Sequence, residues 1–203
     1  MPPHSFLELY VEELKDLYSA ENQILKALPK MIKAATHDEL REAFETHRQQ
    51  TEGHVQRLEQ IFGELDESPR GKKCHGMEGV LEEGAELIQD GPEPAILDAG
   101  LIAAAQHVEH YEMAGYGSVR TWAKKLGFGT QMRLLQQTLD EEKATDALLT
   151  QLAEASVNAD ADAEADLTDG TDGPADMPER ASSQRGPKAK RARPAAPRGT
   201  SRT

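Results

Sequence analysis

Cysteine is almost absent from this sequence, and long apolar runs are absent altogether. The chain has 203 residues and one cysteine, Cys74, which cannot form an intrachain disulfide or build a thiolate zinc site alone. No window contains the roughly 18 consecutive apolar residues of a membrane helix, and the N-terminal segment MPPHSFLELY lacks the basic-then-apolar pattern of a secretory signal. We therefore expect a cytoplasmic protein with no membrane partner, and we exclude a disulfide scaffold and a zinc finger.

Aromatic residues are missing from the C-terminal part of the chain. All of them lie before position 129, whereas residues 156–203 consist largely of Ala, Pro, Gly and charged residues. Such a segment cannot bury enough apolar surface to offset the entropy of ordering it. It is acidic over residues 160–179 and basic over residues 180–202, so its charges cancel and the net charge of −13 lies on the rest of the chain. We expect a folded domain over residues 1–155 and a disordered tail over residues 156–203.

Four long segments of the predicted domain carry apolar residues at helical spacing. The segments cover about residues 5–32, 36–62, 94–126 and 130–155. Ser5 with Glu8, and Thr36 with Glu39, have the spacing of capping boxes at the starts of the first two helices. Pro29 is expected to kink or end the first helix.

The connections between these segments determine the topology. Short linkers join the first two segments and the last two, so each pair must form an antiparallel hairpin. About thirty residues separate the hairpins; they include a short helix predicted over residues 74–89 and are long enough to cross a whole bundle. Strand-type alternation, a glycine-rich phosphate loop and a Ser/His/Asp pattern on a strand-to-helix turn are not found. We predict an all-α four-helix bundle with one long crossover.

Several polar residues fall on or beside the apolar stripes when the helices are placed on wheels at 100° per residue. Four acids are central, another lies at a stripe margin, and the second helix places two histidines on its apolar face with a glutamine at its margin. The central acids are Glu21, Glu112, Glu142 and Asp146, the marginal acid is Glu109, and the second helix supplies His47, His54 and Gln50. In each predicted hairpin, a glutamate on the first helix thus faces two polar residues on the second helix that are four positions apart.

These buried acids require a compensating charge. An unpaired buried carboxylate costs several kcal/mol, and a domain has a net stability of only roughly 5–15 kcal/mol. No Lys or Arg falls on the central stripes, whereas hard metal ions bind carboxylate oxygens and imidazole nitrogens together. A single glutamate on an apolar stripe is usually an edge residue whose charge reaches water, but four central acids at matched heights favour a metal site. His54 is a ligand or a hydrogen-bonded core histidine, His47 supports the ligands or the fold, and Glu109 is a ligand or a solvated side chain.

Five stretches of the chain resemble the YciF-like (YciE/YciF) stress-associated proteins of the ferritin-like superfamily. They span residues 6–155 and read DLYSAENQILKALPKM, THRQQTEGHVQRLEQIF, KKCHGMEGVLEEG, IAAAQHVEHYEMAGYGSVRTWAKKLG and LLQQTLDEEKATDALLTQLAE. The tail after about Ser156 lies outside the family pattern. The resemblance implies a ferritin-like four-helix bundle with a dinuclear metal site, usually iron, built from inward carboxylates and histidine on all four helices.

The resemblance also implies a set of ligands. The positions that match the acids of the family are Glu21, Glu112, Glu142 and Asp146, and His54 matches a position where relatives often have histidine. Gln50 departs from the pattern, because relatives commonly place glutamate there. A neutral amide is a weaker metal ligand, so this departure puts occupancy by two metal ions in doubt.

The leading functional hypothesis is a stress-response protein that holds two iron ions, or iron and manganese, as a ferroxidase or a peroxide-consuming oxidase. Dioxygen or peroxide would bind at an open position of the metal centre. Tyr18 and Tyr111 lie close in sequence to Glu21 and Glu112, where they relay electrons or simply pack. The bundle is also compatible with a homodimer.

Two alternatives come from different functional classes. In the first, the basic tail GPKAKRARPAAPRGTSR contacts the phosphates of a nucleic acid, although the acidic folded part would repel it. In the second, the chain is a metal-free helical interaction module, whose inward acids are solvated through a loose core. Cys74 and His75 in the crossover bind a soft metal weakly or have a structural role.

Overall fold

The predicted all-α fold is confirmed. The structure is a computed structural model that describes residues 3–169, with side chains described up to residue 164. This part of the chain consists of helices and loops and contains no strand. The portion of the predicted disordered tail beyond residue 169, with half of its acidic stretch and all of its basic stretch, lies outside the described residues.

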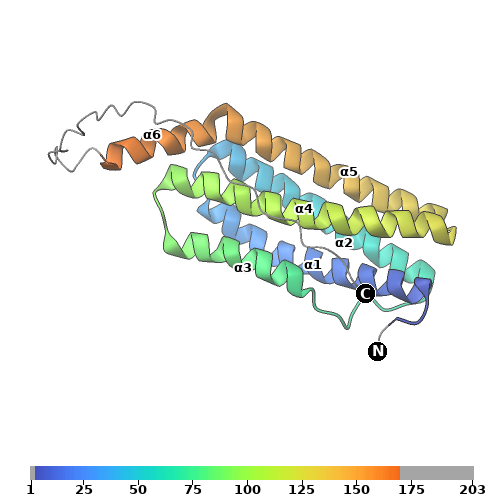
Figure 1. The fold of residues 1–203 in the computed structure, drawn as a ribbon. Helices are drawn as coiled ribbons and strands as arrows, with labels where there is room; N and C mark the ends of the chain where they lie inside the picture. The colour runs from blue at the N-terminus through green and yellow to red at the C-terminus, as the bar shows by residue number, and fades with distance from the viewer. Residues whose placement is uncertain (1–2, 170–203) are drawn as a thin grey trace, which may run out of the picture. The chain divides into compact units, whose positions relative to one another are not determined.

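Four long helices form the bundle, and a shorter helix lies on its side (Figure 1). The first hairpin consists of α1 (Phe6–Ala34) and α2 (Asp38–Leu65), and the second consists of α4 (Pro94–Leu126) and α5 (Gly129–Leu152). Helix α1 contacts α4 and α2 contacts α5, which closes the four helices around a common core. The crossover between the hairpins contains α3 (His75–Asp90), which contacts α1 and α4. Both predicted hairpins and the predicted crossover helix are therefore present.

The first helix starts as its sequence predicts. The Ser5 hydroxyl accepts a hydrogen bond from the backbone N–H of Glu8 at 3.0 Å, which is the N-cap half of the predicted capping box. The Glu8 carboxylate accepts from the N–H of His4 rather than from that of Ser5. Pro29 does not end the helix, which continues to Ala34.

The start of α2 differs from the prediction, because Thr36 and Glu39 do not form a capping box. The N-cap position is His37, whose side chain caps nothing. Instead, Asp98 of α4 accepts hydrogen bonds from the Thr36 N–H at 2.9 Å, the Thr36 hydroxyl at 2.6 Å and the His37 N–H at 2.8 Å. A buried carboxylate from the other hairpin thus caps this turn, a contact between residues about sixty positions apart that local spacing cannot reveal.

Buried positions recur every 3.5 residues along the helices. On α2 and on α5 the buried positions alternate in steps of four and three. Those of α2 include Leu40, Phe44, His47, Thr51, His54, Leu58 and Ile61, and those of α5 include Gln131, Leu135, Thr138, Glu142, Thr145, Leu149 and Leu152. A period of 3.5 rather than 3.6 is typical of helices that coil around one another with a left-handed twist.

The apolar core has two parts with polar residues between them. One apolar cluster includes Ile24, Phe44 and Leu149, and the other includes Leu14, Leu58 and Leu135. On α1, α2 and α5, buried polar side chains occupy the intervening positions of the same seams. The bundle therefore carries a polar layer across its middle.

The chain remains helical beyond residue 155, where the sequence predicts the bundle to end. A π-helical turn, Ala153–Val157, leads into α6 (Asn158–Asp169), which contacts α4. Val157 is buried, and the Glu164 carboxylate accepts a hydrogen bond at 2.7 Å from the Ala95 N–H in the first turn of α4. One buried side chain and one helix cap thus anchor an Ala- and Asp-rich segment whose composition alone suggests disorder.

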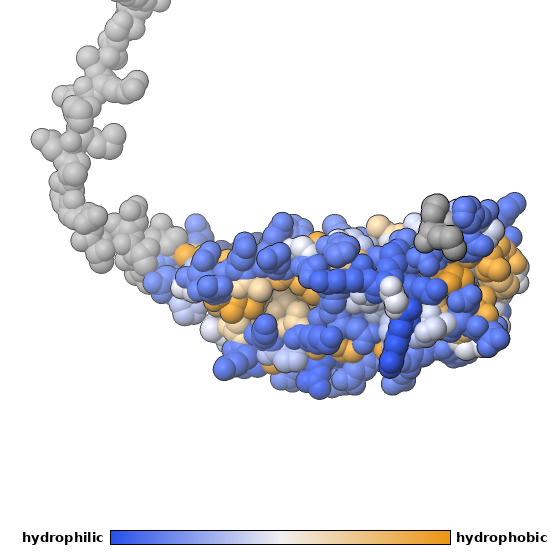
Figure 2. Space-filling view, turned by 90° about the horizontal axis from the view of Figure 1, so that it is seen from below, coloured by the Kyte–Doolittle hydropathy of each residue, from blue (hydrophilic) through white to orange (hydrophobic). Residues whose placement is uncertain are grey.

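The described surface is largely hydrophilic, with local apolar areas. Figure 2 shows the face seen from below the view of Figure 1, where polar residues surround an apolar hollow. Among the described residues, no helix combines the length and the apolarity that crossing a membrane requires.

Replacing Asp98 with alanine is expected to destabilise the fold. The substitution removes three hydrogen bonds that share one buried carboxylate, and a hydrogen bond to a charged group contributes about 1.5–3 kcal/mol net of the hydrogen bonds to water that it replaces. We expect a decrease of about 2–4 kcal/mol in the free energy of unfolding, measured by urea denaturation followed at the helical circular dichroism band. Asp90→Ala, at an exposed position of α3, serves as the control. An equal loss in both variants would contradict the role assigned to Asp98.

Candidate metal centre

Six ionisable side chains from all four long helices meet in the polar layer. Every one of them is at most 3% exposed. Helix α1 supplies Glu21, α2 supplies His47 and His54, α4 supplies Glu109 and Glu112, and α5 supplies Glu142. We call these six residues the central cluster.

The central cluster divides into two groups that share one residue. The first group contains His47, Glu109, Glu112 and Glu142, and the second contains Glu21, His54 and Glu142. Within each group, one potential ligand atom per residue lies within 4.8 Å of all the others. Glu142 has two carboxylate oxygens, so it can face both groups at once.

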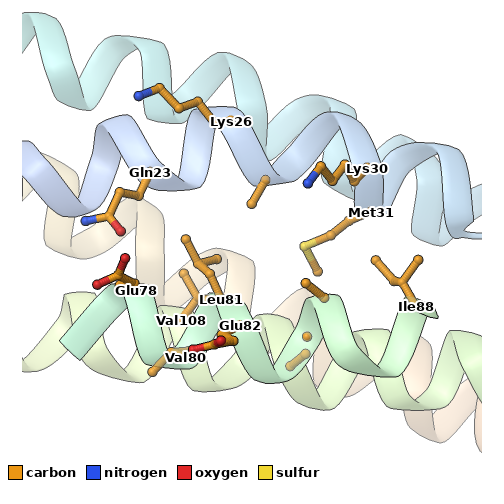
Figure 3. Close-up of a pocket in the computed structure, with 14 residues that line it drawn as sticks. Gln23, Lys26, Lys30, Met31, Glu78, Val80, Leu81, Glu82, Ile88 and Val108 are labelled. Atoms are coloured by element: carbon orange, nitrogen blue, oxygen red, sulfur yellow. The ribbon is translucent and has the colours of Figure 1, made fainter. Parts of the chain in front are cut away.

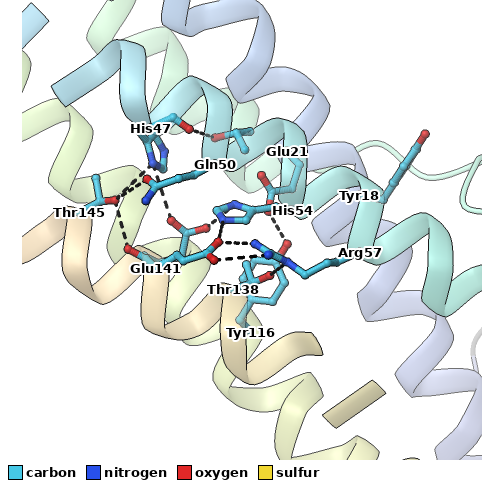
Figure 4. Close-up of polar contacts among 12 residues, drawn as sticks. Tyr18, Glu21, His47, Gln50, His54, Arg57, Tyr116, Thr138, Glu141 and Thr145 are labelled. Atoms are coloured by element: carbon cyan, nitrogen blue, oxygen red, sulfur yellow. Dashed lines mark hydrogen bonds and ion pairs between the residues drawn. The ribbon is translucent and has the colours of Figure 1, made fainter. Parts of the chain in front are cut away.

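His54 lies between three carboxylates (Figure 4). Its Nδ1 is 2.9 Å from Oε1 of Glu142 and 3.4 Å from Oε1 of Glu21. Its Nε2 is 2.9 Å from Oε2 of Glu141, a partly exposed residue outside the cluster. Arg57 donates hydrogen bonds to Glu141 and, at 3.0 Å, to the Thr138 hydroxyl. The ring of His54 is therefore oriented from outside, with Nδ1 turned toward the central cluster.

His47, in the other group of the central cluster, also has a polar neighbour at each ring nitrogen. Its Nε2 lies 3.3 Å from Oε1 of Glu109, and its Nδ1 lies 3.4 Å from the hydroxyl of Thr145. The same hydroxyl donates a hydrogen bond to Oε1 of Gln50 at 3.4 Å. Nδ1 also lies 4.0 Å from Oε2 of Glu142, so both ring nitrogens of His47 lie near carboxylates of the central cluster.

Tyr116 is a further member of the site that sequence reasoning missed. Its side chain is fully buried on α4, and its hydroxyl donates a hydrogen bond to Glu21. In the sequence it fits the apolar period of its helix and is indistinguishable from a packing residue. A tyrosine one turn after Glu112 on the same stripe is the only signal that could have indicated it.

Burial controls the protonation of the carboxylates. It raises the pKa of Glu21, and it raises the pKa values of Glu109 and Glu112 well above the ordinary range, with added repulsion from Glu142 and Glu21. Burial acts in the same direction on Glu142, but the nearby His54 and His47 outweigh it and lower the pKa of that carboxyl. The surroundings therefore favour the ionised form of Glu142 and the protonated forms of Glu109 and Glu112.

The two histidines titrate in opposite directions. Burial disfavours the charged form of both. At His54, the negative charges of Glu21 and Glu142 outweigh burial and raise the pKa to about 10. At His47, burial prevails and lowers the pKa. A protonated His54 therefore acts as an internal cation in the metal-free protein.

Hydrogen bonding within the described part of the chain leaves many atoms of the central cluster unpaired. Eight buried side-chain oxygens and nitrogens of its six residues lack a hydrogen-bond partner, including both oxygens of Glu112 and both of Glu142. Buried polar atoms are almost always satisfied in native proteins, so such a concentration calls for an explanation. Carboxylate oxygens and imidazole nitrogens are the atoms that hard and borderline divalent metals bind, and the donor set therefore fits metal ions.

The structure brings together most of the residues singled out in the sequence. Glu21, His54, Glu112 and Glu142 lie in the central cluster, and so does Glu109, which the helical wheel placed at a margin. Gln50 does not belong to it; its side chain is partly exposed and accepts from Thr145.

Asp146 lies outside the central cluster, contrary to the ligand set implied by its sequence position. Its carboxylate accepts a hydrogen bond from Gln106 at 3.0 Å and lies 3.3 Å from the exposed His110. Asp146 lies seven residues after Leu139, which is buried, so the helical period alone does not decide its position. The contacts with Gln106 and His110 of α4 hold its carboxylate at the flank.

The other candidates have structural roles. Tyr18 donates to Glu59 at 3.0 Å and points away from the central cluster in Figure 4. The hydroxyl of Tyr111 donates to Asp16 at 3.1 Å and lies 2.9 Å from Sγ of Cys74. Cys74 is buried and caps α3 by accepting from the Met77 N–H, whereas His75 is exposed and pairs with Glu78.

Comparison with known proteins identifies the family. A family model described as a domain of unknown function (DUF892) matches residues 5–162. The chain belongs to the DUF892 family. The chain is 43% identical to the protein YciF of Escherichia coli strain K12 over 152 residues, which are 74% of this chain and 92% of that protein. The family match includes the π-helical turn and the start of α6.

Solved structures of DUF892 relatives have the same fold. The crystal structure of the E. coli stress protein YciF matches with a TM-score of 0.74 and 41% identity, over 77% of this chain and 99% of that one. YcfI from Rhodopseudomonas palustris matches with a TM-score of 0.70 and 39% identity, over 72% of this chain and 94% of that one. A protein from Xanthomonas campestris pv. campestris, at 18% identity and a TM-score of 0.64, shares the fold alone.

Glu112→Gln is expected to stabilise the metal-free protein increasingly as the pH rises. The unfolded chain ionises Glu112 near pH 4.3, whereas the folded chain keeps the proton to a higher pH, so the wild type loses stability through this interval. Glutamine cannot ionise and avoids this loss. Urea denaturation of chelator-treated protein should show the variant gaining on the wild type by up to about 1.4 kcal/mol per pH unit.

The matched control for this measurement is Glu45→Gln, at an exposed position of α2. Its free energy of unfolding should follow that of the wild type at every pH. Parallel curves for Glu112→Gln and the wild type would show that Glu112 is not a destabilising buried acid.

Proposed function

We propose that the central cluster holds two metal ions, taken to be iron or iron and manganese, with Glu142 between them. The sharing of Glu142 by the two ligand groups is the observation that carries this proposal. The eight buried atoms of the cluster without a hydrogen-bond partner support it, because they are of the types that metal ions bind.

The composition of the cluster also supports a dinuclear site. It contains four glutamates and two histidines. Dinuclear carboxylate sites in four-helix bundles are built from the same set of four glutamates and two histidines, with two of the helices each carrying a Glu-x-x-His pair. Here both histidines come from α2, and α4 carries Glu109 and Glu112 three residues apart. Because His47 completes the set, the amide of Gln50 is not needed as a ligand.

The charge of the cluster is consistent with two divalent ions. Four carboxylates would carry four negative charges once ionised, and two divalent cations would neutralise them. No Lys or Arg side chain belongs to the central cluster; the nearest described guanidinium contact, that of Arg57, is with Glu141 behind His54. Leaving a buried charge without a partner costs several kcal/mol, so the metal-bound form would be strongly favoured over the fully ionised empty form.

The reaction that fits this centre is the oxidation of iron by dioxygen. Two Fe(II) ions held there would supply one electron each, and these with two protons reduce one dioxygen molecule to hydrogen peroxide. The chain's own residues bind the ions through carboxylates, orient His54 through Glu141, and exclude water by burial in the core. Because the E. coli relative is described as a stress protein, we propose that this activity serves a stress response in the cytoplasm.

The alternatives draw less support. A metal-free interaction module requires inward acids that are solvated, whereas Glu21, Glu112 and Glu142 are fully buried. The nucleic-acid hypothesis depends on the basic residues 180–202, which lie outside the described residues. A homodimer remains a prediction that the single chain does not test.

Metal titration tests the proposal directly. Anaerobic equilibrium dialysis against Fe(II) or Co(II), followed by elemental analysis, should find two ions per chain. Glu142→Gln should reduce binding at both positions, because each group loses a shared ligand. Asp146→Asn should retain both ions, since this carboxylate lies outside the cluster. Admitting air to the iron-loaded wild type should produce Fe(III) and hydrogen peroxide.

Two outcomes would overturn the proposal. One is the absence of bound metal in the wild type. The other is an equal loss of metal in Glu142→Gln and Asp146→Asn, which would show that the ligands are not those of the central cluster.

Metal binding is expected to release protons. The surroundings of His54, Glu109 and Glu112 favour their protonated forms in the metal-free protein, and a metal ion must displace a proton from any of these groups that it binds in that form. Affinity for Co(II) should therefore rise with pH through the neutral range. Calorimetric titration in two buffers of different ionisation enthalpy measures the number of protons released; a binding heat independent of the buffer would contradict the assigned protonation states.

A further inference from the structure

An apolar groove lies between α1 and α3. Its volume is about 290 Å³. Met31 of α1 and Leu81 and Ile88 of α3 point into the space between the two helices, while Lys26 extends away from it (Figure 3). The groove is on the side of the molecule that carries α3, where Figure 2 shows an apolar hollow among polar residues.

A much smaller cavity lies deeper in the core and shares part of its lining with this groove. Its volume is about 20 Å³, which is room for roughly one small molecule. The residues that line both spaces are Ala27, Met31, Leu81 and Val108. We call these four residues the waist.

The inner cavity ends at the central cluster. His47 and Glu109 line it, together with Thr145 and apolar residues such as Ile24 and Leu149. The groove and the inner cavity therefore adjoin at the waist, and together they reach from the surface beside α3 to one of the two proposed metal positions.

The opposite side of the central cluster is polar. There Arg57, Gln50 and Glu141, on α2 and α5, are each partly exposed. Glu141 contacts both Arg57 and His54, so this side offers charged and hydrogen-bonding groups from the surface inward. The two sides would therefore admit different species to the central cluster. The polar side favours the entry of ions, and the waist favours the entry of uncharged apolar molecules.

We propose that the groove, the waist and the inner cavity form the entry path for dioxygen to the central cluster. Moving an ion through an apolar constriction requires the loss of its hydration shell, which costs several kcal/mol or more. Dioxygen has no charge and forms no strong hydrogen bonds with water, and a cavity with space for one small molecule suits its size. The relevance of this path to oxidation rests on the proposed function; the presence of dioxygen in the path does not.

The waist can be closed by a single substitution. Ala27 is only partly buried, and it borders both spaces, so a larger side chain at this position would fill the passage without replacing a cluster residue. Ala27→Phe is the blocking variant, and Ala27→Leu is a smaller block for use if the phenylalanine disturbs folding. Ala103→Phe is the matched control, because Ala103 is exposed on α4 and borders neither space.

The first experiment uses dioxygen itself as a paramagnetic probe of the metal-free full-length protein. Methyl signals in nuclear magnetic resonance spectra are compared under raised pressures of dioxygen and of argon. We expect dioxygen-specific shifts and broadening at Met31, Leu81 and Val108, and none at Leu14 in the other apolar cluster. The effect at Val108 should be lost in Ala27→Phe and Ala27→Leu and kept in Ala103→Phe. Equal effects at Val108 and Leu14, or an undiminished effect in both Ala27 variants, would overturn the proposal.

The second experiment measures iron oxidation together with cobalt binding. The blocked variants should bind Co(II) as the wild type does and oxidise preloaded Fe(II) several-fold more slowly than Ala103→Phe. Unchanged oxidation in a variant that excludes dioxygen from Val108 would overturn the entry path. Failure of the wild type to bind cobalt or iron would refute the proposed function instead, while the methyl measurements still decide whether dioxygen occupies the passage.

Discussion

The mutual repulsion of buried carboxylates is the constraint around which this bundle is organised. Glu21, Glu109, Glu112 and Glu142 meet in a region that water does not reach, and the apolar clusters on either side keep them there. Within the protein, the main compensation is a protonated His54 and protons retained on some of the acids. The polar layer is therefore a place where positive charge must be supplied, by protons or by metal ions.

This constraint connects the stability of the protein to its proposed chemistry. The seams of the helices bring the acids together because the same 3.5-residue period that aligns Leu135 and Leu149 also aligns Glu142. Packing of the apolar clusters thus offsets the unfavourable electrostatics of the layer between them. The four long helices therefore hold the carboxylates and imidazoles of the proposed cation site together, and no flexible loop contributes a residue to the central cluster.

Sequence periodicity was sufficient for the architecture and for most of the cluster, since helix boundaries and hairpins are local features. It failed where long-range geometry decides. The sequence assigned His47 a supporting role because it lies almost two turns from His54, whereas in the structure its ring meets Glu109, Glu112 and Glu142. Asp146 was placed centrally, but contacts with Gln106 and His110 of α4 hold its carboxylate at the flank. The cap that Asp98 provides for the turn at Thr36, and the anchoring of α6 through Glu164, join distant parts of the chain and leave no local pattern.

The crossover helix α3 stands apart from the four helices that carry the cluster. Met77 is its one buried residue, and it rests on α1 and α4 while forming the outer wall of the groove. Its other residues are exposed or partly buried, so the face of α3 that borders the groove adds little to the buried core of the bundle. Substitutions on the face of α3 that lines the groove would therefore change which small molecules enter the interior, while the six residues of the central cluster stay unchanged.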